Sequence, residues 1–205
     1  MDFGNRIVFI GDSITEWGRF EDTEGIGTGY VRILHDYLRV TYPEKNYEII
    51  NRGIGGDRII NLEDRWQKDV LDLKPTTVSI SIGINDVWRQ LDQPNIEQVY
   101  PEQFEEKYRN LLLKLKQELN PTIILMDPTV IEEDINSKGN QALKPYVAVV
   151  EKLAKEFDAI RVTTHEAFIN YLKKKSGYLL TTDGVHMNSA GNMLMAQTWI
   201  NEVEK

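Results

Sequence analysis

The amino-acid sequence predicts an α/β protein in which a five-stranded parallel sheet lies between two layers of helices. Strand-like runs of apolar and β-branched residues alternate with helical patterns along the whole chain, which is typical of βαβ units. Because parallel strands are joined by right-handed crossovers, the connecting helices cover both faces of such a sheet. The sequence therefore predicts a three-layer α/β/α sandwich.

The individual elements follow from hydrophobic periodicity. Short apolar runs predict strands near residues 7–10, 47–51, 78–82, 123–126 and 159–162. Apolar residues spaced three or four apart predict helices near 30–42, 59–73, 101–119, 143–157 and 189–203. The second helix shows the basis, because Ile59, Leu62, Trp66, Val70 and Leu73 form one apolar stripe. Pro75 then ends the pattern.

Length and composition predict a single domain that spans residues 1–205. The chain is 41% hydrophobic and 27% charged, which suits one globular unit with a sizeable core. We find no linker, low-complexity segment or repeat of fixed period in the sequence. Nothing in the sequence therefore marks a second domain.

Composition also excludes several classes of function. The chain contains no cysteine, which rules out disulfides, a thiol nucleophile and thiolate metal sites. A formal charge of −8 argues against nucleic acid as a partner, because that partner requires clustered Lys and Arg. The first predicted strand begins too early for a signal peptide to precede it, and no apolar run could span a membrane. We therefore expect a cytoplasmic protein without a membrane partner.

Polar, glycine-containing loops follow the first three predicted strands and precede the last predicted helix. The carboxyl ends of parallel strands meet at one edge of the sheet, where open α/β folds bind their ligands. The loops are Gly11-Asp12-Ser13, the segment 51–57, Gly83-Ile84-Asn85-Asp86 and Asp183-Gly184-Val185-His186.

These loops contain the residue types that acyl transfer requires. Ser13 could attack an ester carbonyl, and His186 could take its proton and return it to the leaving alcohol. Asp183, three positions before His186, could hold the imidazole in the required tautomer. The candidate oxyanion donors are the backbone N–H groups of Ser13 and Gly56 and the side-chain amide of Asn85.

Each candidate also has a structural interpretation. Ser13 could be a helix N-cap, and Asp183 with His186 could be half of a metal site. Aromatic and basic residues near the loops could bind a sugar or simply belong to the core. The substrate-binding candidates among them are Trp88, Arg89 and Tyr30, with Trp17 as a further uncertain case.

The four blocks resemble, in composition and order, those of the SGNH (GDSL) esterase and lipase superfamily. They are Gly11-Asp12-Ser13, Gly56, Gly83-x-Asn85-Asp86 and Asp183-x-x-His186. The resemblance implies Ser13 as nucleophile, Asp183 and His186 as the rest of a triad, and Gly56 and Asn85 as oxyanion donors. It also implies a flavodoxin-like sandwich, no metal or organic cofactor, and hydrolysis of a small-molecule or oligosaccharide ester.

Flanking segments are similar to bacterial acetylxylan esterases of this superfamily, which remove acetyl groups from xylan or xylo-oligosaccharides. The similar segments are Gly27-Thr28-Gly29-Tyr30 and the run 81–90. The chain differs from these enzymes at Thr182, where an aromatic residue is common, and at Met187, where the superfamily often has proline.

The sequence leaves open two other functions and one question about assembly. The same triad could serve a lysophospholipase or a thioesterase. A non-catalytic glycan-binding module on this fold is a more distant reading. Related enzymes often assemble, so a homo-oligomer is also an expectation.

Overall fold

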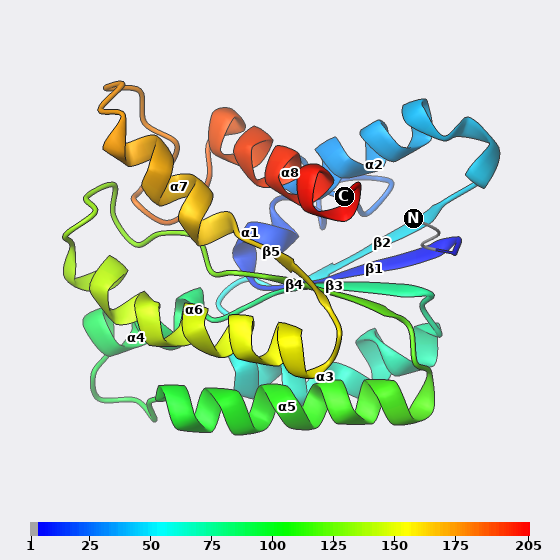
Figure 1. Cartoon of the computed structure of the whole chain (residues 1–205), viewed down its shortest axis with the longest axis horizontal. Coiled ribbons are helices and arrows are strands. Elements are labelled where there is room, and N and C mark those ends of the chain that lie inside the picture. The colour runs from blue at the N-terminus through cyan, green and yellow to red at the C-terminus, as the bar shows by residue number, and fades with distance from the viewer. Residues whose placement is uncertain (1–3) are drawn as a thin grey trace.

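A five-stranded, all-parallel sheet forms the centre of the computed structural model, which describes residues 4–205 (Figure 1). The first three residues of the segment before the first predicted strand, 1–3, lie outside this range. The strand order is β2-β1-β3-β4-β5, which confirms the predicted sheet. The strands are β1 Arg6–Gly11, β2 Glu48–Gly53, β3 Thr77–Ser81, β4 Thr122–Met126 and β5 Ile160–Val162.

Helices cover both faces of the sheet, which confirms the predicted sandwich. On one face, α2 (Tyr30–Thr41) and α7 (Thr164–Lys173) pack against α8 (Ser189–Val203). On the other, α5 (Pro101–Glu118) packs against α3 (Ile59–Asp69) and α6 (Lys138–Glu156), and α6 also contacts α4 (Ile84–Asp92). Figure 1 shows the two groups on opposite sides of the strands. A short helix, α1 (Ser13–Glu16), follows β1.

Two helices, α4 and α7, were not predicted from the sequence, and two predicted helices have different bounds. In α4, the polar pair Asn85 and Asp86 is buried within the helix, so its pattern resembles a turn. Helix α6 begins at Lys138 because the Ser137 side chain accepts a hydrogen bond from the N–H of Asn140 at 3.0 Å. Helix α3 ends at Asp69, after which its apolar stripe continues in the 3₁₀ turn Leu71–Leu73. A second 3₁₀ turn, Pro43–Lys45, lies between α2 and β2.

The core surrounds the central strands. The residues of β3 are all buried, as expected for a strand with helices on both faces. Phe9 of β1 contacts the ring of Trp199 from α8 at a centroid distance of 5.9 Å. None of the helices within residues 4–205 is long and apolar enough to cross a membrane.

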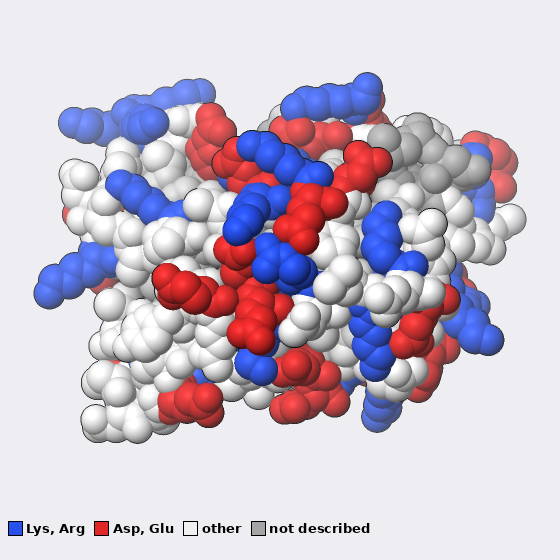
Figure 2. Space-filling view, turned by 60° about the horizontal axis from the view of Figure 1, so that its bottom comes forward, with Lys and Arg blue, Asp and Glu red and all other residues white. Residues whose placement is uncertain are grey.

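The outer face of the α5–α6 layer carries charges of both signs. Figure 2 shows Lys and Arg interleaved with Asp and Glu across this face. Arg109 of α5 pairs with Glu105 and with Glu156 of α6, and Lys152 also pairs with Glu105. Charges arranged in this way do not form the single-sign basic surface that a polyanion would bind.

The register of the central strands brings three loops together. Gly11, at the end of β1, is opposite Gly53 of β2 and Ser81 of β3. The loops that follow these three strands therefore begin side by side at the carboxyl edge of the sheet. A Cβ atom at position 11 would lie 2.2 Å from the carbonyl oxygen of Ser81, so only glycine permits this approach.

Candidate active site

Ser13 is the first residue of α1 and lies directly beyond the end of β1. The carboxylate of Asp12 caps α1 by accepting a hydrogen bond from the N–H of Ile14 at 3.0 Å. The N–H of Ser13, at the start of the helix, has no intrahelical acceptor. The structural reading in which Ser13 is the N-cap is therefore wrong, because Asp12 occupies that position.

Ser13, His186 and Asp183 form a continuous relay across the carboxyl edge of the sheet. Ser13 Oγ lies 2.8 Å from His186 Nε2, and His186 Nδ1 lies 2.6 Å from Asp183 Oδ2. With a proton on Nδ1, the imidazole donates to the carboxylate and its Nε2 can accept the proton of the serine hydroxyl. The structure therefore joins, in a single chain of hydrogen bonds, residues that are 173 positions apart.

The Asp183 loop is organised around its own carboxylate. Asp183 Oδ1 accepts hydrogen bonds from the N–H groups of Val185 and His186 at 3.0 and 2.8 Å. Partial burial works against the charged form, but these bonds and the bond from the His186 ring outweigh it and lower the pKa of Asp183. The carboxylate is therefore ionised and oriented at neutral pH.

The same loop is tied to the segment after β4. The carbonyl of Gly184 accepts a hydrogen bond from the N–H of Glu132 at 2.7 Å. The carboxylate of Glu133 accepts hydrogen bonds from the N–H groups of Leu180 and Thr181 and from the Thr181 hydroxyl. These contacts hold the segment that carries Asp183 and His186 against the edge of the sheet, and the sequence pattern did not single out either glutamate.

Gly56 lies in the loop that follows β2, and Asn85 lies just after β3, at the start of α4. Asn85 is buried in the first turn of α4, where its Nδ2 donates to the carbonyl of Asp57 at 3.1 Å. Its Oδ1 accepts from Arg89 Nη2 at 3.4 Å, so these bonds use only one of the two amide hydrogens. Gly56 is exposed and has a φ of 82°, a backbone conformation that favours glycine.

Two indole rings flank His186. Trp17 stacks on the imidazole with ring centroids 5.4 Å apart and an interplanar angle of 22°, and Trp88 meets it edge-on at 5.9 Å. The guanidinium of Arg89 lies 4.9 Å from the centroid of the Trp88 ring and pairs with Asp92. Trp88 and Arg89, which were substrate-binding candidates, therefore lie beside the relay, and so does Trp17.

The prediction that Tyr30, the third candidate, binds substrate is wrong. Its side chain is 0% exposed and its hydroxyl is hydrogen-bonded to Thr15 Oγ1 at 3.0 Å. Its ring lies edge-on to Phe9 at 6.2 Å. Tyr30 is the first residue of α2 and its side chain belongs to the core, so it cannot contact a substrate, although its position next to a glycine-rich segment resembled a binding loop.

Asp12 and Asp86 are buried carboxyl groups close to Ser13 and Asn85, and both support helix starts. Asp86 accepts a hydrogen bond from the N–H of Ile59, the first residue of α3. Burial raises the pKa of Asp86 to about 7 and that of Asp12 to about 7. Neither group hydrogen-bonds to the relay, so both hold helix starts in place at the edge of the sheet.

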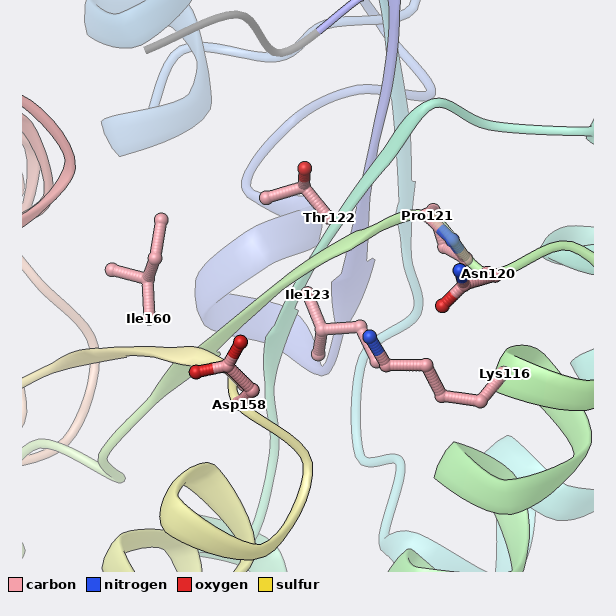
Figure 3. A pocket seen from close by; sticks show the side chains of 8 residues that line it. Lys116, Asn120, Pro121, Thr122, Ile123, Asp158 and Ile160 are labelled. Atoms are coloured by element: carbon pink, nitrogen blue, oxygen red, sulfur yellow. The ribbon is translucent and has the colours of Figure 1, made fainter.

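Within residues 4–205, no group of three His, Cys, Asp or Glu side chains is arranged to hold a metal ion. A surface hollow lies at the amino ends of β4 and β5, the edge of the sheet opposite Ser13 (Figure 3). Its polar lining comes from Lys116, Asn120, Thr122 and Asp158, and it contains no serine or histidine. The groups that acyl transfer requires are therefore gathered at the carboxyl edge.

A serine–histidine–aspartate relay at this edge of a parallel α/β sheet defines the class of serine acyl hydrolases. The sequence pattern of the GDSL-like lipase/acylhydrolase family matches residues 9–194. The chain belongs to this family and is a carboxylic-ester hydrolase.

Known enzymes are similar to this chain over nearly its full length. The chain is 39% identical over 207 aligned residues to an acetylxylan esterase of Geobacillus stearothermophilus, covering 98% of this chain and 94% of that enzyme. The crystal structure of Axe2, an acetylxylan esterase from the same organism, superposes with a TM-score of 0.90 at 36% identity, covering 100% and 97% of the two chains. LAE5, an α/β hydrolase from the metagenome of Lake Arreo in Spain, superposes with a TM-score of 0.92 at 31% identity, with the same coverage.

Proposed function

We propose that this chain hydrolyses short-chain acyl esters, acetyl esters above all, of xylo-oligosaccharides or related sugars through an acyl-enzyme intermediate on Ser13. The observation that carries the proposal is the unbroken relay of 2.8 and 2.6 Å from Ser13 through His186 to Asp183. The preference for acetylated sugars is supported by the relatives from Geobacillus stearothermophilus, which are acetylxylan esterases.

In this mechanism, Ser13 Oγ attacks the ester carbonyl while His186 Nε2 takes the hydroxyl proton. Asp183 stabilises the imidazolium that forms. The carbonyl oxygen becomes an oxyanion and accepts hydrogen bonds from the Ser13 and Gly56 N–H groups and from Asn85 Nδ2. When the intermediate collapses, the C–O bond to the sugar breaks and His186 returns the proton to the leaving alcohol. Water then releases the acid from Ser13 by the same steps.

Variants of Axe2 support these roles. Three structures described as catalytic mutants of that enzyme have alanine in place of an aspartate, a histidine or a serine. The aspartate and the histidine are three positions apart, as Asp183 and His186 are. Trp17 and Trp88, which lie beside His186, are aromatic residues of the kind that pack against sugar rings.

Hydrolysis of p-nitrophenyl acetate, butyrate and octanoate by the wild type and by Ser13→Ala tests the proposal. We expect activity that falls with acyl length and a Ser13→Ala turnover reduced by roughly 10⁴–10⁶-fold. Near-normal hydrolysis by the mutant would refute the role of Ser13. Activity that rises with acyl length would favour a lipase-like substrate, and wild type that resists labelling by an organophosphonate would favour the glycan-binding module.

Two further experiments address substrate and assembly. Release of acetate from acetylated xylo-oligosaccharides, compared with release from an acetylated monosaccharide, tests the sugar specificity. Assembly into a homo-oligomer stays a prediction, which light scattering on the purified chain would test.

A further inference from the structure

Arg65 on α3 connects the segments that carry two of the candidate oxyanion donors, Ser13 and Gly56. It reaches the third donor, Asn85, through Asp57. Its Nε donates to the Asp57 carboxylate at 2.7 Å, and its Nη2 donates to the carbonyl of Gly11 at 2.9 Å. Its Nη1 donates to the carbonyl of Arg52 at 2.8 Å and to Asp69 at 3.0 Å. One guanidinium therefore links the end of β1, the end of β2 and the loop before α3.

Two of these contacts, those with Gly11 and Asp57, lie close to a candidate donor in the chain. Gly11 is two residues before Ser13, and Asp57 directly follows Gly56. The carbonyl of Asp57 accepts the hydrogen bond from Asn85 Nδ2 at 3.1 Å, so the same residue that Arg65 holds also orients the third donor. The Arg65 contacts thus reach Ser13, Gly56 and Asn85 without touching the reacting atoms.

The loop that carries Gly56 needs such an anchor. Gly55 and Gly56 are exposed, and an added Cβ at Gly56 would have no heavy atom within 4 Å, so packing does not restrain the loop there. On one side, the N–H of Ile54 bonds to the carbonyl of Gly11 at 3.0 Å. On the other side, the ion pair of Asp57 with Arg65 holds the loop, and both side chains are largely buried, at 11% and 13% exposure.

We propose that Arg65 is the positioning residue of the oxyanion hole, acting through Asp57 and the carbonyl of Gly11 to place the three donors at one point. The inference rests on the proposed function of Ser13, Gly56 and Asn85. A planar guanidinium suits this role because its donors lie in fixed directions, whereas an ammonium carries the same charge without that geometry. Donors that stabilise an oxyanion must be held in place before the charge develops.

The test compares Arg65→Met, Arg65→Lys and the control Arg161→Met. Arg161 is a matched control because it also makes a bidentate ion pair with a buried aspartate, Asp127, at 2.9 and 3.0 Å. It lies on β5 and contacts neither Ser13, Gly56 nor Asn85. Steady-state kinetics with p-nitrophenyl acetate would be measured for each folded variant well below its own thermal midpoint.

We expect Arg65→Met to lower kcat by roughly 10–100-fold, since a displacement of about 1 Å at a catalytic centre can cost about 10²-fold. The KM should change by less than about threefold, because the oxyanion exists only in the transition state. The pH profile of kcat/KM should not move, because the relay of His186 and Asp183 is untouched. Arg65→Lys should recover only part of the loss, and Arg161→Met should keep wild-type kcat.

Several outcomes would overturn the proposal. They are a kcat of Arg65→Lys equal to wild type, a rise in KM without a fall in kcat, or an equal loss in Arg161→Met. If Arg65→Met does not fold, Asp57→Asn provides the same readout, because it removes the ion pair and keeps the backbone carbonyl that orients Asn85. The Ser13→Ala variant keeps the two proposals separate. If it is inactive while the Arg65 variants are normal, only the role of Arg65 fails.

Discussion

Asn85→Ala provides a direct test of the oxyanion hole. The amide of Asn85 has two Nδ2 hydrogens, of which one is occupied by the carbonyl of Asp57 at 3.1 Å. In the proposed mechanism, the other hydrogen is donated to the developing oxyanion. Removing one such donor typically costs about 2.7–4 kcal/mol of transition-state stabilisation, or ~10²–10³-fold in kcat. We expect this loss with little change in KM, because the ground-state carbonyl carries no full charge.

The substitution also affects stability, so the assay must separate the two effects. Asn85 is 1% exposed, and its loss leaves the carbonyl of Asp57 without this bond, at a cost of about 1–3 kcal/mol. Ser79→Ala is a suitable control, because it removes the buried hydrogen bond from Trp199 Nε1 at 3.1 Å in the core. It should lower the thermal midpoint and leave kcat unchanged.

The measurement is kcat and KM for p-nitrophenyl acetate on folded protein, with thermal unfolding recorded for both variants. A kcat of Asn85→Ala within about threefold of the wild type would refute the assignment of Asn85 as an oxyanion donor. Equal losses of kcat in the two variants would show that destabilisation, rather than a lost donor, lowers the rate.

Two further predictions concern a buried carboxyl group and a core hydroxyl. Burial raises the pKa of Asp86 from 3.8 to about 7, so its contribution to stability is present below pH 3.8 and is lost as the pH rises to about 7. The urea midpoint of the wild type should therefore fall between about pH 5 and pH 8, and that of Asp86→Asn should fall less. An equal fall in the two proteins would contradict this prediction. Tyr30→Phe should leave kcat/KM for p-nitrophenyl acetate unchanged and lower the free energy of unfolding by about 1 kcal/mol, since only the bond to Thr15 is lost. A large drop in kcat/KM would instead indicate that Tyr30 contributes to the active site.

Local patterns were sufficient to predict the sheet and the chain order of the site. The apolar runs at β1, β3 and β4 reflect burial on both faces of the sheet, and the edge strands β2 and β5 are only partly buried. The loops with Ser13, Asn85 and His186 follow from the same patterns, because each loop is next to a predicted strand or helix. Helix α4 was missed because its first turn contains the buried polar residues Asn85 and Asp86, which resemble a turn in the sequence.

The roles of Tyr30 and Arg65 depend on long-range contacts. Tyr30 stands beside a glycine-rich segment in the sequence, yet α2 places its ring in the core against Phe9. Arg65 lies on the charged side of a helix. The carbonyls that it binds belong to Gly11 and Arg52, which are separated from Arg65 by 54 and 13 positions in the sequence. Hydrophobic periodicity indicates on which side of its helix or strand a residue lies. It does not indicate which other elements pack against that side.

The α/β class, the parallel sheet and the residue types at its carboxyl edge could be predicted from the chain, because they follow from local composition and from the geometry of parallel strands. Which side chains meet at that edge depends on the folded arrangement. Only strand register and helix packing bring Ser13 within 2.8 Å of His186 and place one guanidinium against three loops, since such contacts join residues whose separation along the chain carries no information about their distance in space.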